Sequence, residues 1–192
     1  MIGKLQQKTL SKSSQTESLR RILEVLLLMG VGALAIALRA RLRMGLNMPG
    51  HHGIYFMALI FLARKNSKLT LATTLTSLGT GLLLLAPFLG FKDPMQAAVY
   101  ILPGITLDLL FILLPQNKKH SLTILALACG AAWMSIPLVR LLIHLTTGMP
   151  FDSFLKHGYF YPLFAWFMAG SMGGFAGAGI QIISNRLFKK HL

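Results

Sequence analysis

The sequence predicts an all-α integral membrane protein, a six-transmembrane-helix bundle with both termini cytoplasmic. The first observation is composition, because 54% of the 192 residues are hydrophobic, only 12% are charged and the mean hydropathy is positive. Such a composition is typical of membrane proteins and not of soluble domains. The second is that the apolar runs lack the period-two alternation of strands, and in lipid only helices or closed barrels satisfy their backbone. The third is an uneven distribution of Lys and Arg between the runs.

The chain divides into a polar N-terminal segment and one membrane domain. Residues 1–21 are rich in Ser, Thr, Gln and Lys and end in two arginines, so we expect a cytoplasmic N-terminal tail. Residues 22–192 then form a single six-helix membrane domain, because about 20 residues per span leave no room for a second, soluble domain. The expected spans are 22–40, 53–63, 69–91, 95–115, 121–146 and 158–186.

The basic residues predict the orientation. If both ends lie on one face, the tail, the second and fourth loops and the C-terminus together hold thirteen Lys and Arg, and the opposite face holds five. Because cytoplasmic loops carry the excess of positive charge, both termini are expected in the cytoplasm and the first loop outside, in a multi-pass protein of the cell inner (cytoplasmic) membrane. The lipid bilayer is the expected partner of this basic face. Nucleic acid is not an expected partner despite the net charge of +14, since the basic residues punctuate apolar runs.

The segment "LNMPGHHGIYFMALIFLARK", residues 46–65, places two histidines immediately before an apolar run. That run, residues 54–63, rises only about 15 Å as a helix, which is half of a hydrocarbon core. Three structures remain open for the residues before it. The helix extends back through them, or an irregular segment dips into the bundle beside protein or a wet cavity. The third is a plain loop with its histidines at the lipid headgroups.

Polar and aromatic residues gather on the predicted outward side and are the candidates for binding a small-molecule substrate. Arginines alternate at 39, 41 and 43 against the positive-inside trend, which an anionic partner or snorkelling to lipid phosphates would explain. Arg140 and His144 are spaced i, i+4 on one helical face. Aromatic residues in the last outer loop fit an interfacial belt as well as a binding site. The candidate substrate-binding residues are Arg43, Asn47, Gly50, His51, His52, Tyr100, Arg140, His144 and Tyr159.

Asp108 is the most deeply embedded acid, in "LPGITLDLLFILLP". Intramembrane carboxylates are costly and are therefore functional candidates. Asp108 lies about 20 Å down its helix, nearer the cytoplasmic face than the histidines. We expect it to pair with a basic residue from an inner loop, with the floor of a deeper pocket as the alternative.

Two spans carry small-residue stripes that permit close helix approach. In the first span, Gly30, Ala33, Ala37 and Ala40 lie on one face and are candidates for contact with a partner helix. In the last span, overlapping small-xxx-small patterns over residues 170–177 favour packing within the bundle. Packing within the chain is also the alternative for the first stripe.

The segment Ala33-Leu-Ala-Ile-Ala37, together with an outward first loop leading into the second span, resembles the substrate-binding S components of energy-coupling factor (ECF) transporters. The resemblance covers the whole chain as architecture. It implies a pocket at the outward loops and helix ends, with residues 50–52 in the first-loop wall. It also implies partners, namely an ECF T subunit that meets the AxxxA segment and two ATPase subunits.

The expected function is capture of a vitamin, cofactor precursor or other anionic or metal-bearing molecule, such as a corrinoid or haem-like ligand, without a bound cofactor of the protein's own. A metal site is not expected, because adjacent histidines on a helix point about 100° apart. An enzyme is not expected either, since the chain lacks HExxH, Gly-x-Ser-x-Gly and paired aspartates at a workable spacing. The alternatives are a membrane scaffold that holds other proteins and, less favoured, an intramembrane enzyme with a His base and Asp108.

Overall fold

The computed structural model describes residues 2–41, 48–86, 94–119 and 121–189, and the regular elements in these ranges are all helices. Four segments are long and apolar enough to cross a membrane: Gln15–Arg41, Met95–Leu113, Leu122–Thr147 and Phe160–Leu187. This confirms the predicted all-α membrane protein. The helices are α1 (Ile2–Arg41), α2 (Gly53–Asn66), α3 (Ala72–Leu84), α4 (Pro94–Val99), α5 (Leu102–Leu113), α6 (Leu122–Thr147), α7 (Asp152–His157) and α8 (Phe160–Lys189).

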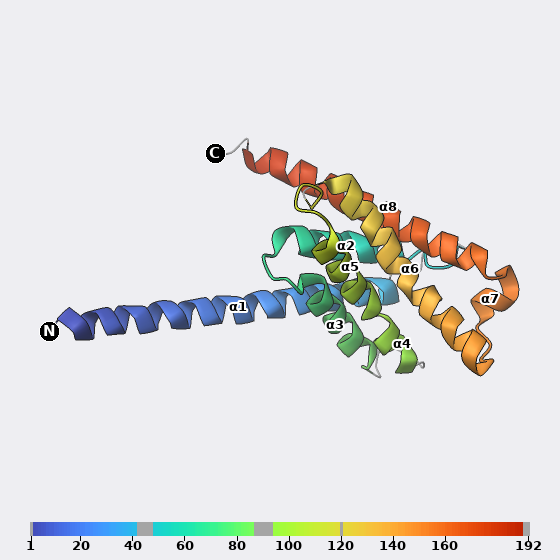
Figure 1. Ribbon diagram of the computed structural model, residues 1–192, viewed down its shortest axis with the longest axis horizontal. Coiled ribbons are helices and arrows are strands. Elements are labelled where there is room, and N and C mark those ends of the chain that lie inside the picture. Colours follow the sequence, from blue (N-terminus) through green and yellow to red (C-terminus); the bar gives the residue numbers. More distant parts are fainter. Residues whose placement is uncertain (1, 42–47, 87–93, 120, 190–192) are drawn as a thin grey trace.

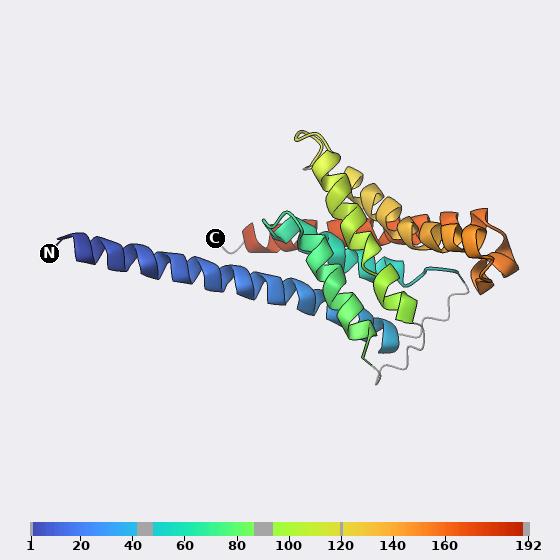
Figure 2. The ribbon, with the colours of Figure 1, turned by 60° about the horizontal axis from the view of Figure 1, so that its bottom comes forward.

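Helix α1 is continuous through the predicted boundary between tail and first span. Its N-terminal half projects away from the other helices (Figures 1 and 2), and residues 15–23 are exposed. The second half packs through a face that contains Leu28, Gly32, Ala35 and Ile36.

Helix α8 packs between α6 and α2 through its small residues. A Cβ added at Gly170 would lie 2.5 Å from Cβ of Trp133 on α6, and one at Gly173 would lie 2.4 Å from the carbonyl oxygen of Ile54 on α2. Both distances are shorter than van der Waals contact, so the absent side chains are what permits this approach. The prediction that the small-residue patterns of the last span serve internal packing is confirmed.

Helix α1 packs on α3 through a face that differs from the predicted small-residue stripe. A Cβ added at Gly32 would lie 1.7 Å from the carbonyl oxygen of Thr76, and Thr80 Oγ1 donates to the Gly32 carbonyl at 3.0 Å. A Cβ added at Gly30 meets nothing within 4 Å. Gly30 and Ala40 are exposed and Ala33 and Ala37 are half-buried, so this stripe points largely away from the bundle.

The predicted fourth span, residues 95–115, consists of the two helices α4 and α5. They are separated at Tyr100 and Ile101, and Pro103 lies in the first turn of α5. Proline has no N–H to donate and its ring excludes the preceding turn, which explains why one helix stops and another begins here. The break leaves the Tyr100 side chain buried in the centre of the bundle.

Candidate functional site

Residues 48–52 form a compact turn against the bundle, so the helix of the second span does not extend back through the histidines. The N–H of His51 donates to the Met48 carbonyl at 3.3 Å, and that of Gly53 donates to the Gly50 carbonyl at 2.8 Å. Gly50 has φ of 77°, which is the left-handed region that glycine tolerates. Trp133 Nε1 donates to the Gly50 carbonyl at 3.1 Å, and a Cβ on Gly50 would collide with the Trp166 ring. Of the three predicted possibilities, the structure has the irregular segment packed against protein.

The turn covers a group of five rings, which we call the aromatic cluster: His52, Phe56, Tyr100, Trp133 and Trp166. The two indoles stack with ring centroids 5.0 Å apart, and the His52 ring meets both edge-on at 5.3 and 5.4 Å. Phe56 and Tyr100 are 1% exposed and Trp133 is fully buried. Edge-to-face and offset arrangements of this kind are the preferred geometries of aromatic rings. The cluster joins the 48–52 turn and α2 to the α4–α5 break, α6 and α8.

The two adjacent histidines have different surroundings. His52 Nε2 forms a hydrogen bond with the Tyr100 hydroxyl, and the two rings lie nearly parallel. His51 Nδ1 lies 2.9 Å from the Met48 carbonyl, so Nδ1 carries the proton of this hydrogen bond. Nε2 is the ring nitrogen that takes no part in it. His52 is thus part of the packed cluster. His51 lies at the edge of the cluster, with its ring centroid 5.6 Å from that of His52.

Two arginines flank the aromatic cluster. The guanidinium carbon of Arg39, in the last turn of α1, lies 5.0 Å from the Tyr100 ring centroid, and that of Arg140 on α6 lies 6.0 Å from Trp166. These are cation–π distances. When the Gln96 amide is oriented so that its oxygen faces donors and its nitrogen faces acceptors, the oxygen accepts from Nη1 and Nη2 of Arg39 at 2.7 and 2.8 Å. The cluster is therefore bordered by positive charge on two sides.

The acids whose side chains the structure describes, Glu17, Glu24 and Asp108, lie away from the aromatic cluster. Glu17 and Glu24 line a groove beside the loop that follows α2, and Asp108 forms an ion pair with Arg64 at the far end of α2. The region of the aromatic cluster attracts anions through its arginines, and the buried rings beneath hold the turn that carries His51.

Asp108 belongs to a separate buried network. Its carboxylate accepts from Arg64 Nη1 at 3.0 Å, and from the N–H and hydroxyl of Thr74 at 2.8 Å each. The Arg64 guanidinium also lies over the Phe111 ring and donates to the Thr70 carbonyl at 2.9 Å. The prediction that Asp108 pairs with a basic residue is confirmed, and the partner Arg64 lies in the last turn of α2 where the sequence predicted an inner loop.

His144 and Tyr159 lie in a second ring group, outside the aromatic cluster. Their ring centroids are 6.0 Å apart, and both rings pack near Phe154. His144 Nδ1 lies 2.6 Å from the Met149 carbonyl, so this imidazole holds the loop after α6 against the helix. Two further predicted site residues, Arg43 and Asn47, lie outside the described residues.

The structure thus brings together five of the predicted binding residues: Gly50, His51, His52, Tyr100 and Arg140.

Sequence reasoning left four residues out of this group, namely Arg39, Phe56, Trp133 and Trp166. The signal that could have found the tryptophans is their number, because they are the two in the chain. Arg39 belongs to the alternating arginines noted in the sequence. Among the described residues, no group of three or more His, Cys, Asp or Glu side chains could hold a metal ion.

A search of protein-family models, of curated proteins and of solved structures finds no match to this chain.

Proposed function

We propose that this chain is the substrate-binding membrane subunit of an uptake transporter of the ECF type. It captures an anionic small molecule, such as a carboxylated vitamin, a cofactor precursor or a metal-bearing macrocycle, at the end of the bundle that carries the aromatic cluster. The observation that carries this proposal is the convergence of Arg39, His51 and Arg140 on the edge of that cluster. These residues come from three separate segments, as in ligand sites formed between the helices of a bundle.

The chemistry of this region favours binding over reaction. An arginine binds a carboxylate or phosphate through two parallel hydrogen bonds, and the buried rings hold the flanking residues in place. The His51 ring, with its proton on Nδ1, has Nε2 as an acceptor, which suits a hydroxyl or amide donor of the ligand or the metal of a macrocycle. The hydrogen bond between His52 and Tyr100 fixes both rings, so His52 shapes the site.

The proposed topology has six crossings and both termini in the cytoplasm of a cell inner membrane. The crossings are α1, α2, α3, the α4–α5 pair, α6 and α8. Helix α2 has 14 residues and rises about 21 Å, so the 48–52 turn supplies the remaining depth. In this orientation the aromatic cluster faces outward and Arg64 lies near the basic cytoplasmic side.

The outward-pointing stripe of α1 supports a helical partner. Gly30 is exposed with nothing within 4 Å of an added Cβ, so another helix could approach the α1 backbone closely there. We propose that an ECF T subunit, linked to two ATPase subunits, meets α1 along Gly30, Ala33, Ala37 and Ala40. A protein that serves only as a membrane scaffold would use the same stripe, which makes the scaffold the second candidate function.

The test is native mass spectrometry with absorbance on detergent-purified protein from cells grown in rich medium. The expected result is a retained small molecule that is lost from an Arg140→Gln variant. An Arg186→Gln variant is the matched control, because it removes one positive charge from an exposed site on α8. A ligand-free parent protein that stays empty against vitamins and corrinoids, but retains a protein partner, would replace the proposal with the scaffold. Consumption of an added compound would replace it with an enzyme.

A further inference from the structure

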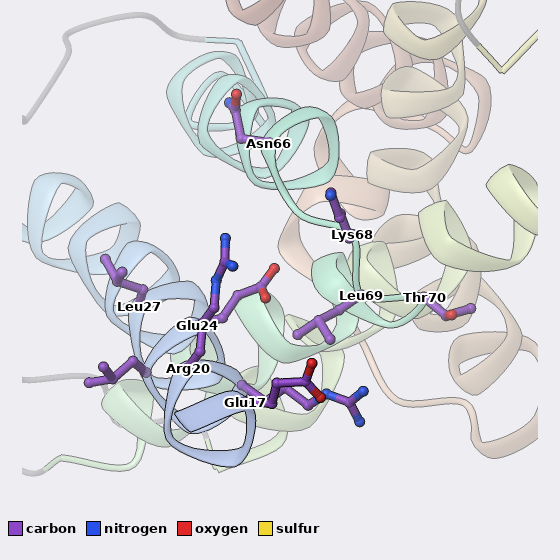
Figure 3. A pocket seen from close by; sticks show the side chains of 10 residues that line it. Glu17, Arg20, Glu24, Leu27, Asn66, Lys68, Leu69 and Thr70 are labelled. Carbon is purple, nitrogen blue, oxygen red and sulfur yellow. The ribbon is translucent and has the colours of Figure 1, made fainter. Parts of the chain in front are cut away.

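A polar groove lies between the middle of α1, residues 17–27, and the loop that follows α2. Figure 3 shows Arg20 and Glu24 pointing from α1 toward the segment that carries Asn66 and Lys68. The groove has a volume of 860 Å³. Its lining residues are Glu17, Arg20, Arg21, Leu23, Glu24, Leu27, Asn66, Lys68, Leu69 and Thr70.

Three of these side chains are cations and two are carboxylates. Glu24 is already engaged, because its Oε1 accepts from the Ser67 hydroxyl at 2.6 Å. Ser67 in turn accepts from the N–H of Leu69 at 3.1 Å, so the carboxylate is held against the loop. The three cations Arg20, Arg21 and Lys68 outnumber the two carboxylates by one, and Glu24 is held against the loop, so the groove favours an anion.

A second groove continues from the first along the contact between α1 and α2. It is almost wholly apolar, has a volume of 340 Å³ and shares Glu24, Leu27 and Asn66 with the polar groove. Its remaining lining residues are Leu28, Val31, Leu59, Leu62, Ala63 and Ser67.

The order of the two grooves along α1 matches the shape of an amphiphile. Arg20 and Arg21 lie at one end, and Val31 lies about 16 Å further along the helix axis. The basic end of the grooves contains the polar residues that precede the apolar span of α1. This position corresponds to the depth at which headgroups meet acyl chains in a bilayer.

We propose that this pair of grooves binds one anionic glycerophospholipid from the leaflet at the basic end of the bundle. Its phosphate contacts Arg20, Arg21 and Lys68, and one acyl chain lies in the apolar groove along Val31 and Leu62. The bound lipid fills the space between α1 and α2 beside the Glu24–Ser67 hydrogen bond. This site is independent of the proposed ligand site, which lies at the opposite end of α2.

The experiment is native mass spectrometry of the full chain after delipidation, titrated in turn with phosphatidylglycerol, phosphatidylethanolamine and phosphatidylcholine of identical acyl chains. The protein is expected to retain one phosphatidylglycerol molecule more tightly than either of the two zwitterionic lipids. An Arg20→Gln/Arg21→Gln variant should lose roughly five-fold in phosphatidylglycerol affinity for each arginine removed. A Lys118→Gln/Lys119→Gln variant is the matched control, since it removes the same charge from a basic pair outside both grooves.

A Val31→Phe variant tests the apolar groove separately and should reduce retention of every two-chain lipid. Should the double arginine variant fold poorly, Lys68→Gln in the loop gives the same headgroup test at one charge. Equal retention of all three lipids, a preference for a zwitterionic lipid, or an equal loss in the lysine control would overturn the proposal. Detection of a protein dimer without lipid would assign the groove to a second copy of the protein. Unchanged lipid binding to the Val31→Phe variant would exclude an acyl chain in the apolar groove.

Discussion

The Arg64 guanidinium donates to the Asp108 carboxylate across 3.0 Å, and the two side chains are only 5% and 2% exposed. This pair connects α2 to α5, and the Thr74 contacts add α3. Removing two charges from water is costly, and the attraction between them repays that cost only when further hydrogen bonds satisfy the carboxylate. Here Thr73, Thr74 and Arg64 all donate to Asp108, so the pair is a structural joint of the three helices.

Asp108→Asn should destabilise the protein strongly, because it leaves the Arg64 charge buried without its counterion. Breaking one partner of a buried pair costs about 3–5 kcal/mol, whereas an apolar replacement of both partners is often neutral. An Arg64→Met/Asp108→Leu double variant should therefore melt closer to the parent than Asp108→Asn. Melting temperatures in detergent measure both. An unchanged melting temperature with lost ligand retention would instead make Asp108 the floor of a binding pocket.

His52→Ala and His51→Ala should have different effects on stability. His52 is enclosed by Tyr100, Trp133 and Trp166, so its truncation leaves a void and costs about 2–4 kcal/mol, as large-to-small core changes do. His51 lies at the edge of the cluster and should cost less than about 1 kcal/mol. His51→Ala should nonetheless weaken ligand retention, if the proposed function is right. Thermal melting and ligand retention in the same samples separate the two effects, and equal losses of folded protein would contradict the distinction.

Gly32→Ala should disrupt the contact between α1 and α3, while Gly30→Ala should not. A methyl group at Gly32 would lie 1.7 Å from the Thr76 carbonyl oxygen, so the helices must separate. At Gly30 nothing lies within 4 Å, and alanine is the better helix former by about 1 kcal/mol. The yield of folded monomer and its melting temperature measure the difference. Similar behaviour of the two variants would mean that α1 packs on another face.

A bulkier residue at Gly30 tests the proposed partner contact. Gly30→Leu should leave the isolated protein folded but reduce co-purification of any helical partner, because the close approach to the α1 backbone is lost. Ile22→Ala, on the exposed face nearer the N-terminus, is a control that shortens an exposed side chain. Partner recovery that is the same for parent and Gly30→Leu would remove the stripe from the interface.

The sequence by itself determined the class of protein, the approximate helices and the types of the polar residues. Composition and run lengths predict membrane helices, and the short run after the two histidines showed only that the residues before it must supply further depth, as helix, irregular segment or loop. The cost of a carboxylate at this depth favoured a cationic partner for Asp108 over the floor of a pocket.

Only the tertiary structure decided which residues meet. Asp108 meets Arg64, which lies 44 residues away, and adjacent His51 and His52 divide between edge and interior. Gly32 rather than Gly30 faces α3. The physical reason is that a membrane helix is apolar both where it meets lipid and where it meets another helix. Hydrophobic periodicity therefore cannot show which face packs inward, and only the complementary shapes of neighbouring helices decide it.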